Sequence, residues 1–149
     1  MTDLRPVRYD EEHPLVRALS AEMAERYGDG DASHPADPAG FGPPHGVFLV
    51  AAVDGEEVAC GGVRLLLPGI GEVKRMYVAP AHRNRGLARA LLKALVEHAR
   101  VAGLGELWLE TGTAQPEAIT LYLSEGFVPV PPYGQYRDHP DSRCYALRL

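Results

Sequence analysis

Cysteine and long apolar runs are scarce in this chain. Its 149 residues include two cysteines, Cys60 and Cys144, which lie far apart and outside any CxxC motif. We therefore expect neither a disulfide framework nor a bound metal, and this usage favours a reducing, cytoplasmic compartment. The chain has no run of about 18 apolar residues that could span a membrane, and its first residues lack the apolar centre of a signal peptide. A membrane partner is accordingly not expected.

Positive charge is also in the minority. Lysine and arginine number 15 against 20 aspartate and glutamate residues, which gives a net charge of −5. This balance argues against nucleic acid as the main partner and fits an amine-bearing substrate. Hydrophobic residues make up 46% of the chain and charged residues 23%, as in globular proteins. At this length we expect one domain, residues 1–149, around a single core.

Two common nucleotide-binding motifs are missing, the dinucleotide fingerprint G-x-G-x-x-G and the P-loop G-x-x-x-x-G-K-[ST]. Instead, residues 83–88 read Arg-Asn-Arg-Gly-Leu-Ala, an R-x-x-G-x-A pattern between a predicted strand and a predicted helix. Gly86 lets the backbone approach a phosphate, and the N–H groups at a helix start carry partial positive charge. Basic or potentially basic side chains gather at the same place: His82, Arg83, Arg85 and Arg89. In an acidic chain this cluster predicts an anionic ligand.

The periodicity of apolar residues predicts a mixed α/β domain with antiparallel strands first and a strand–helix–strand crossover in the middle. Strands are expected at Leu4–Tyr9, Val47–Val53, Val58–Leu67, Gly71–Val78, Glu106–Thr111 and Arg143–Leu149, with a return to the sheet at Gly126–Phe127. Helices are expected at Glu11–Tyr27, Gly86–Ala102 and Pro116–Ser124. Asp54-Gly55 marks a hairpin turn. The Gly- and Pro-rich stretch Asp29–His45 is either a binding loop or a plain connector.

In this context the R-x-x-G-x-A turn resembles the acyl-CoA pyrophosphate turn, [QR]-x-x-G-x-[GA], of the Gcn5-related N-acetyltransferase (GNAT) superfamily. The resemblance covers most of the chain. It is most specific in EVKRMYVAPAHRNRGLA, residues 72–88, and LETGTAQPEAITLYLSEGF, residues 109–127. It implies the acyl-CoA N-acyltransferase fold: a mixed, mostly antiparallel central sheet of six to seven strands with about four helices. The implied activity is transfer of an acetyl group from acetyl-CoA to a primary amine.

The resemblance also implies a set of coenzyme contacts. In the family, the strand before the turn splays from its neighbour and pairs through its backbone with pantetheine, which corresponds here to Met76, Tyr77 and Val78. The pyrophosphate would be held by the backbone N–H groups of Asn84, Arg85, Gly86, Leu87, Ala88 and Arg89, with Arg83 or Arg89 adding charge. Many relatives have a coenzyme-binding asparagine where this chain has Gln115. Pro116 follows it and can begin a helix without losing a needed N–H.

Acetyl transfer needs a deprotonated amine, and a free alkyl amine has a pKa of about 10.4. A carboxylate can remove the proton, directly or through water. Glu72 precedes Gly86 by 14 positions, the spacing of the general-base glutamate in several relatives. On strand alternation it is expected to share a face with Lys74 and Met76, and the alternative interpretation is an exposed glutamate paired with Lys74. Glu110, at the end of the next strand, is the second candidate base.

Tyr122 lies where the family often has the tyrosine that protonates the coenzyme A thiolate. The alternative is an aromatic residue packed beside Phe127. A covalent route through Cys60 would need a reactive thiol, but VACGG offers no adjacent basic group to lower its pKa. A buried structural cysteine and direct transfer within a ternary complex are therefore predicted.

The substrate end is expected to involve the C-terminal segment PPYGQYRDHPDS. It concentrates aromatic and charged side chains: Tyr133, Tyr136, Arg137, Asp138 and His139. They could bind an amine and an acidic group of the substrate, or the tyrosines could simply pack this loop on the sheet edge. A small-molecule amine is the favoured acceptor. The alternatives are a protein N-acetyltransferase, a non-catalytic acyl-CoA-binding sensor, and an interaction domain with an incidental anion site. The resemblance also implies a homodimer, because members of the family commonly associate through the C-terminal strand.

Overall fold

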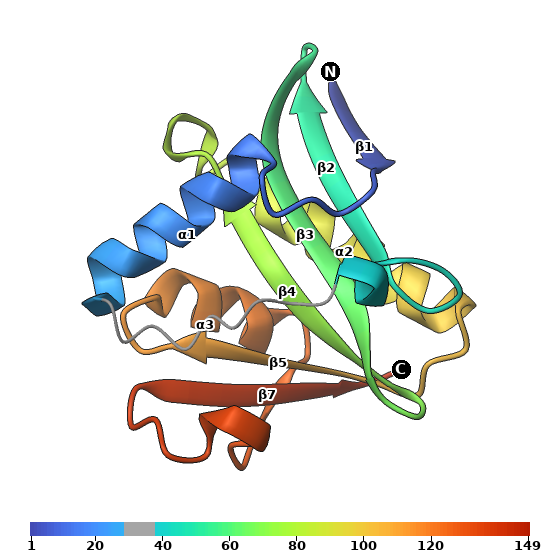
Figure 1. Ribbon diagram of the computed structural model, residues 1–149, viewed down its shortest axis with the longest axis vertical. Coiled ribbons are helices and arrows are strands. Elements are labelled where there is room, and N and C mark those ends of the chain that lie inside the picture. Colours follow the sequence, from blue (N-terminus) through green and yellow to red (C-terminus); the bar gives the residue numbers. More distant parts are fainter. Residues whose placement is uncertain (29–37) are drawn as a thin grey trace.

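One seven-stranded sheet organises the chain (Figure 1). The computed structural model describes residues 1–28 and 38–149, so most of the predicted loop Asp29–His45 lies outside the described residues. The strands are β1 (Thr2–Pro6), β2 (Val47–Val53), β3 (Glu56–Leu67), β4 (Ile70–Val78), β5 (Glu106–Gly112), β6 (Val128–Val130) and β7 (Ser142–Arg148). They lie in the order β1-β2-β3-β4-β5-β7-β6, and all neighbours are antiparallel except β4 and β5. The predicted mixed, mostly antiparallel sheet is confirmed.

Three α-helices pack against this sheet in the described part of the chain: α1 (Pro14–Tyr27), α2 (Leu87–Val101) and α3 (Pro116–Ser124). Short 3-10 helices, η2 (Pro38–Phe41), η3 (Pro80–His82) and η4 (Gly134–Tyr136), add single turns. Helices α1 and α2 cover opposite faces (Figure 1), each with its own apolar cluster. None of the described helices combines the length and apolar character that a membrane span requires.

Two predicted boundaries shift for local reasons. The first helix was expected from Glu11, but α1 begins at Pro14. Proline is favoured at the first helical position, and His13 Nδ1 accepts the Leu15 N–H at 3.1 Å as the N-cap. The first strand ends at Pro6, before the predicted Tyr9, because Tyr9 turns inward to stack on Phe41 with ring centroids 4.3 Å apart.

The parallel pair formed by β4 and β5 is short. Their register covers Ile70↔Glu106, Gly71↔Leu107 and Glu72↔Trp108, after which the strands separate. Figure 1 shows β4 running away from β5 toward its carboxyl end. Beyond Glu72, the edge of β4 that faces β5 therefore has no strand partner among residues 1–28 and 38–149. This opening is the splay that the sequence resemblance implies.

A β-bulge lies in β4 where the strands part. Lys74 pairs with Gly62 and Tyr77 with Cys60, so Arg75 and Met76 together stand opposite Gly61. Arg75 adopts a left-handed φ of 63°. Because the extra residue reverses the alternation of faces, the expectation that Met76 shares a face with Glu72 is wrong. Met76 instead packs over Gly61 and beside the α2 core.

The C-terminal strand is internal to the sheet. β7 pairs with β5 along its whole length and with β6 through Cys144–Ala146. A second copy that paired with β7 would have to displace β6. The edges of the described sheet are β1 and β6.

Candidate active site

The turn between β4 and α2 exposes backbone donors. Asn84 and Gly86 both have left-handed backbone angles, with φ of 64° and 80°. Among the described residues, the N–H groups of Gly86 to Arg89 have no backbone acceptor, and the helical ladder begins with Ala90 donating to the Gly86 carbonyl at 3.0 Å. A Cβ on Gly86 would meet open space, so the approach to these groups is clear. Free N–H groups at a helix start form an anion site.

The arginines of this turn have different partners. Arg83 Nε donates to the Val78 carbonyl at 2.8 Å, and its Nη2 pairs with Glu22 of α1 at 2.6 Å. Arg89 is paired with Glu125. Arg85 is exposed and has no ion-pair partner in the described part of the chain. Of the arginines in the predicted cluster, Arg85 is thus the one whose charge no described carboxylate offsets.

A cavity of about 220 Å³ lies at the opening between β4 and β5. Its wall is built from α1, β4, β5, α3 and the C-terminal segment. Five of the residues predicted as catalytic or coenzyme-binding contribute to it: Glu72, Met76, Glu110, Gln115 and Tyr122. Lys74 lines it from one face of the sheet and Met76 from the other, so the cavity passes through the sheet where the strands part.

Tyr122 of α3 packs beside Phe127, and it also lies where a proton donor to the thiolate was predicted. Its ring is tilted against Phe127 with centroids 5.9 Å apart, and it also lines the cavity. Its hydroxyl has no hydrogen-bond partner among the described residues. Burial, and then the charge of Glu110, raise the pKa of Tyr122 far above its ordinary value. The hydroxyl therefore stays protonated at neutral pH and can act only as a donor of its proton.

Glu72 is more strongly engaged than the sequence suggested. It is 1% exposed, so the interpretation as a solvent-exposed glutamate is wrong. Arg64 Nε and Nη2 both lie 2.8 Å from Oε1, and Tyr133 Oη donates to Oε2 at 2.6 Å. Arg64 stands directly opposite Glu72 in the β3–β4 ladder, where opposite charges attract. Both carboxylate oxygens are thus occupied and the charge is neutralised.

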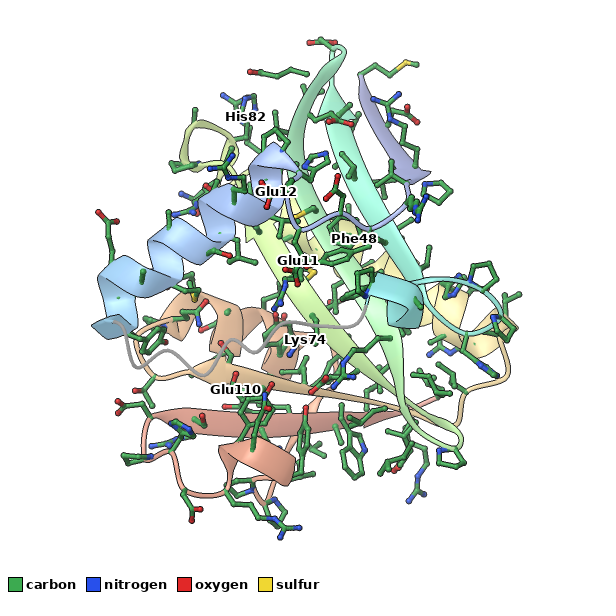
Figure 2. All side chains as sticks on the ribbon, in the orientation of Figure 1. Glu11, Glu12, Phe48, Lys74, His82 and Glu110 are labelled. Carbon is green, nitrogen blue, oxygen red and sulfur yellow. The ribbon has the colours of Figure 1, made fainter. Side chains whose placement is uncertain are left out.

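Glu110 is half-buried on the other side of the opening. Ser142 Oγ donates to its Oε2 at 2.6 Å. It lies two positions beyond Trp108, the last β5 residue that pairs with β4. Lys74 lies equally far beyond Glu72, so Lys74 and Glu110 flank the opening, as Figure 2 shows. Sequence reasoning did not single out Lys74, whose burial depends on the C-terminal segment.

The C-terminal segment closes the cavity partly through its tyrosines. Tyr133 packs on Trp108 with centroids 5.1 Å apart and edge-on against Tyr136 at 5.3 Å. Burial raises the pKa of both tyrosines. Tyr136 and His139 line the cavity. The other predicted substrate residues of this segment, Arg137 and Asp138, are exposed and are not part of the cavity wall.

Cys60 is a structural cysteine, as predicted. It is 0% exposed, and its Sγ donates to the Arg75 carbonyl at 3.3 Å. Burial raises the pKa of its thiol to about 12. A thiol held in this form is a poor nucleophile at neutral pH.

Known proteins resemble the chain in sequence and structure. The sequence profile of the acetyltransferase (GNAT) family matches residues 12–127. The chain is 37% identical over 127 residues to an IAA acetyltransferase of Azospirillum brasilense, covering 85% of this chain and 82% of that protein. It is 34% identical over 143 residues to the uncharacterized N-acetyltransferase YedL of Escherichia coli K12, covering 92% and 89%.

A comparison of structures also points to the acyltransferases. A solved structure from Klebsiella pneumoniae, named as an acyl-CoA N-acyltransferase, matches with a TM-score of 0.80 and 30% identity. The match covers 100% of this chain and 98% of that one. The Arg-Gly turn, the parted strands and the cavity between them therefore belong to a known architecture. The chain is a member of the GNAT family and an acyl-CoA-dependent acetyltransferase.

Proposed function

We propose that the protein transfers the acetyl group of acetyl-CoA directly to the primary amine of a small molecule, both substrates being bound at once. The observation that carries this proposal is the cavity at the β4–β5 opening, whose wall includes Glu110 and Tyr122. Its wall includes Lys74 from one face of the sheet and Met76 from the other. Two substrates can therefore meet in it without exchanging places, as a ternary complex requires.

The coenzyme would bind on the face of the sheet that α2 covers. The N–H groups of Gly86 to Arg89 would hold the diphosphate, with Arg85 adding charge. Along β4, the backbone at Met76 and Tyr77 lies past the end of pairing with β5, so it is open to the amide groups of pantetheine. The Val78 carbonyl, a further predicted contact, already accepts a hydrogen bond from Arg83. A diphosphate and an extended amide chain fit these groups.

Tyr122 would donate its proton to the departing thiolate. A thiol has a pKa of about 8.5, so this proton assists departure of the thiolate without being essential to it. For the base, Glu110 is the stronger candidate. Glu72 is neutralised by Arg64 and hydrogen-bonded by Tyr133, whereas Glu110 accepts a neutral hydroxyl and lines the same cavity.

A small acceptor fits the size and walls of the cavity. A volume of about 220 Å³ beneath α1 and the C-terminal segment accommodates a metabolite-sized amine. The sensor alternative requires a site without acid or base, whereas Tyr122 and Glu110 both line this one. The Azospirillum relative is named as an acetyltransferase that acts on IAA, which also supports a small acceptor.

The function itself is tested by calorimetric titration with acetyl-CoA and desulfo-CoA, followed by thiol release with a panel of small amines. We expect binding of both coenzymes and turnover with at least one amine. Binding without turnover on any amine would favour the sensor, and acetylation confined to peptide N-termini would favour a protein acceptor. Absence of binding would contradict the coenzyme assignment altogether.

The phosphate turn is tested by Gly86→Asp. We expect this variant to lose measurable acetyl-CoA binding, because a carboxylate is then held against the phosphate. Gly103→Asp is the matched control, since Gly103 has a similar φ of 84° and open space around its Cβ position but lies at the other end of α2. Wild-type affinity in Gly86→Asp, measured by calorimetry, would contradict the assignment.

The general acid is tested by Tyr122→Phe. We expect kcat to fall roughly 10- to 100-fold, near the lower end of general-acid effects, with the KM for acetyl-CoA little changed. Tyr145→Phe is the control, because Tyr145 is as buried as Tyr122 in the same cluster and does not line the cavity. Equal kcat losses in the two variants would point to packing rather than proton donation.

The roles of the two carboxylates are tested by comparing the variants Glu110→Gln and Glu72→Gln. Glu110→Gln should lower kcat/KM by roughly 10²- to 10⁴-fold at nearly unchanged stability. Glu72→Gln should mainly lower the free energy of unfolding, by up to about 3–5 kcal/mol, since it leaves the Arg64 charge without its partner. Urea unfolding and steady-state kinetics measure both. The reverse pattern would make Glu72 the base.

A further inference from the structure

Lys74 is a buried cation whose hydrogen-bonding capacity is mostly unused. Its side chain is 10% exposed and lines the cavity. Its Nζ donates one hydrogen bond, to Tyr136 Oη at 3.2 Å, although an ammonium group has three donors. Glu72 Oε1 lies 3.9 Å away, beyond hydrogen-bonding distance. Two donors of Lys74 thus have no acceptor among the described residues.

The surrounding charges do not balance Lys74. Arg64 already neutralises Glu72 at 2.8 Å, and Tyr133 fills the other carboxylate oxygen. One positive charge therefore remains among Arg64, Glu72 and Lys74, and burial without a directly paired anion is costly. The charge of Glu110 also acts on Lys74, from the neighbouring strand. Desolvation accordingly lowers the pKa of Lys74, while the charge of Glu72 opposes that shift. An anion inside the cavity would supply the missing partner.

The cavity has opposite charges on its two rims. Lys74 lies on β4 and Glu110 on β5, each two positions past the last pair of the parallel ladder, and Figure 2 shows them on the two sides of the opening. No ion pair joins the two in the described contacts. Asp141 adds a second carboxylate to the wall on the β7 side. A molecule that bears both an amine and an acidic group complements this arrangement.

We propose that the acceptor is an amino acid or a similar amine that carries a carboxylate, and that Lys74 and Tyr136 bind the carboxylate while the amine lies toward Glu110. This inference rests on the proposed transfer to a small amine and names its substrate class. Lys74 lies on the face opposite Met76, so the carboxylate would be kept away from the coenzyme side. Lys74 is then a specificity residue for the acceptor.

The test offers each amine in three forms: the amino acid, its carboxamide and its decarboxylated amine, compared at equal concentration of unprotonated amine. For the wild-type protein, kcat/KM should favour the acid form by roughly 10- to 100-fold, the range of a hydrogen-bonded charge pair. Lys74→Met should remove this preference, mainly by raising the KM for the acid form. Lys74→Arg should restore part of it. Lys93→Met, at an exposed lysine of α2, is the matched control and should leave the preference intact.

The possible outcomes distinguish failure of this inference from failure of the proposed acetyltransferase function. Turnover on amines without any preference for the acid form would overturn the carboxylate subsite and leave the acetyltransferase proposal standing. An unchanged preference in Lys74→Met would also overturn it. Binding of acetyl-CoA with no turnover on any form would overturn the proposed function and the subsite together. Circular dichroism identifies a misfolded variant, in which case the wild-type comparison of the three forms decides alone.

Discussion

The early end of pairing between β4 and β5 is the constraint on which the rest of the site depends. The two strands share a register of three pairs that ends at Glu72 and Trp108. Beyond it, the β4 edge has no strand partner in the described part of the chain. Backbone N–H and C=O groups that are removed from water need hydrogen-bond partners. An extended amide chain can supply those bonds. The same separation opens the cavity, so the proposed coenzyme and acceptor sites share one structural cause.

The bulge at Arg75 sends neighbouring side chains of β4 to opposite faces of the sheet. An extra residue in β4 reverses the side-chain alternation, which turns Met76 toward α2. Lys74 stays on the opposite face with Tyr136, and Arg75 Nε reaches Tyr9 on the α1 side at 3.1 Å. An uninterrupted strand would put Met76 on the same face as Lys74. The bulge thus separates the apolar Met76 side of the cavity wall from the charged Lys74 side, which is the division that the proposed ternary complex uses.

Glu72 and Glu110 carry the same carboxylate group but have different charged and polar neighbours. Arg64 and Tyr133 hold Glu72 in place, and a buried ion pair of this kind orients its surroundings more than it stabilises the fold. Glu110 accepts a hydrogen bond from the neutral hydroxyl of Ser142 and lies across the opening from Lys74. This difference in surroundings is the reason for proposing Glu110, and not Glu72, as the base.

The sequence alone determined those structural features that depend on residues close together along the chain. Apolar periodicity predicted the main strands and helices and the crossover between them. The R-x-x-G-x-A pattern predicted the turn before a helix, and the family resemblance singled out Tyr122. Only the tertiary structure decided which carboxylate is neutralised and which face Met76 takes. It also decided that Lys74 is buried. These properties arise between segments far apart, as with Tyr133 and Glu72, which are 61 positions apart and joined by one hydrogen bond. Strand register and a one-residue bulge set such contacts, and no local pattern encodes either.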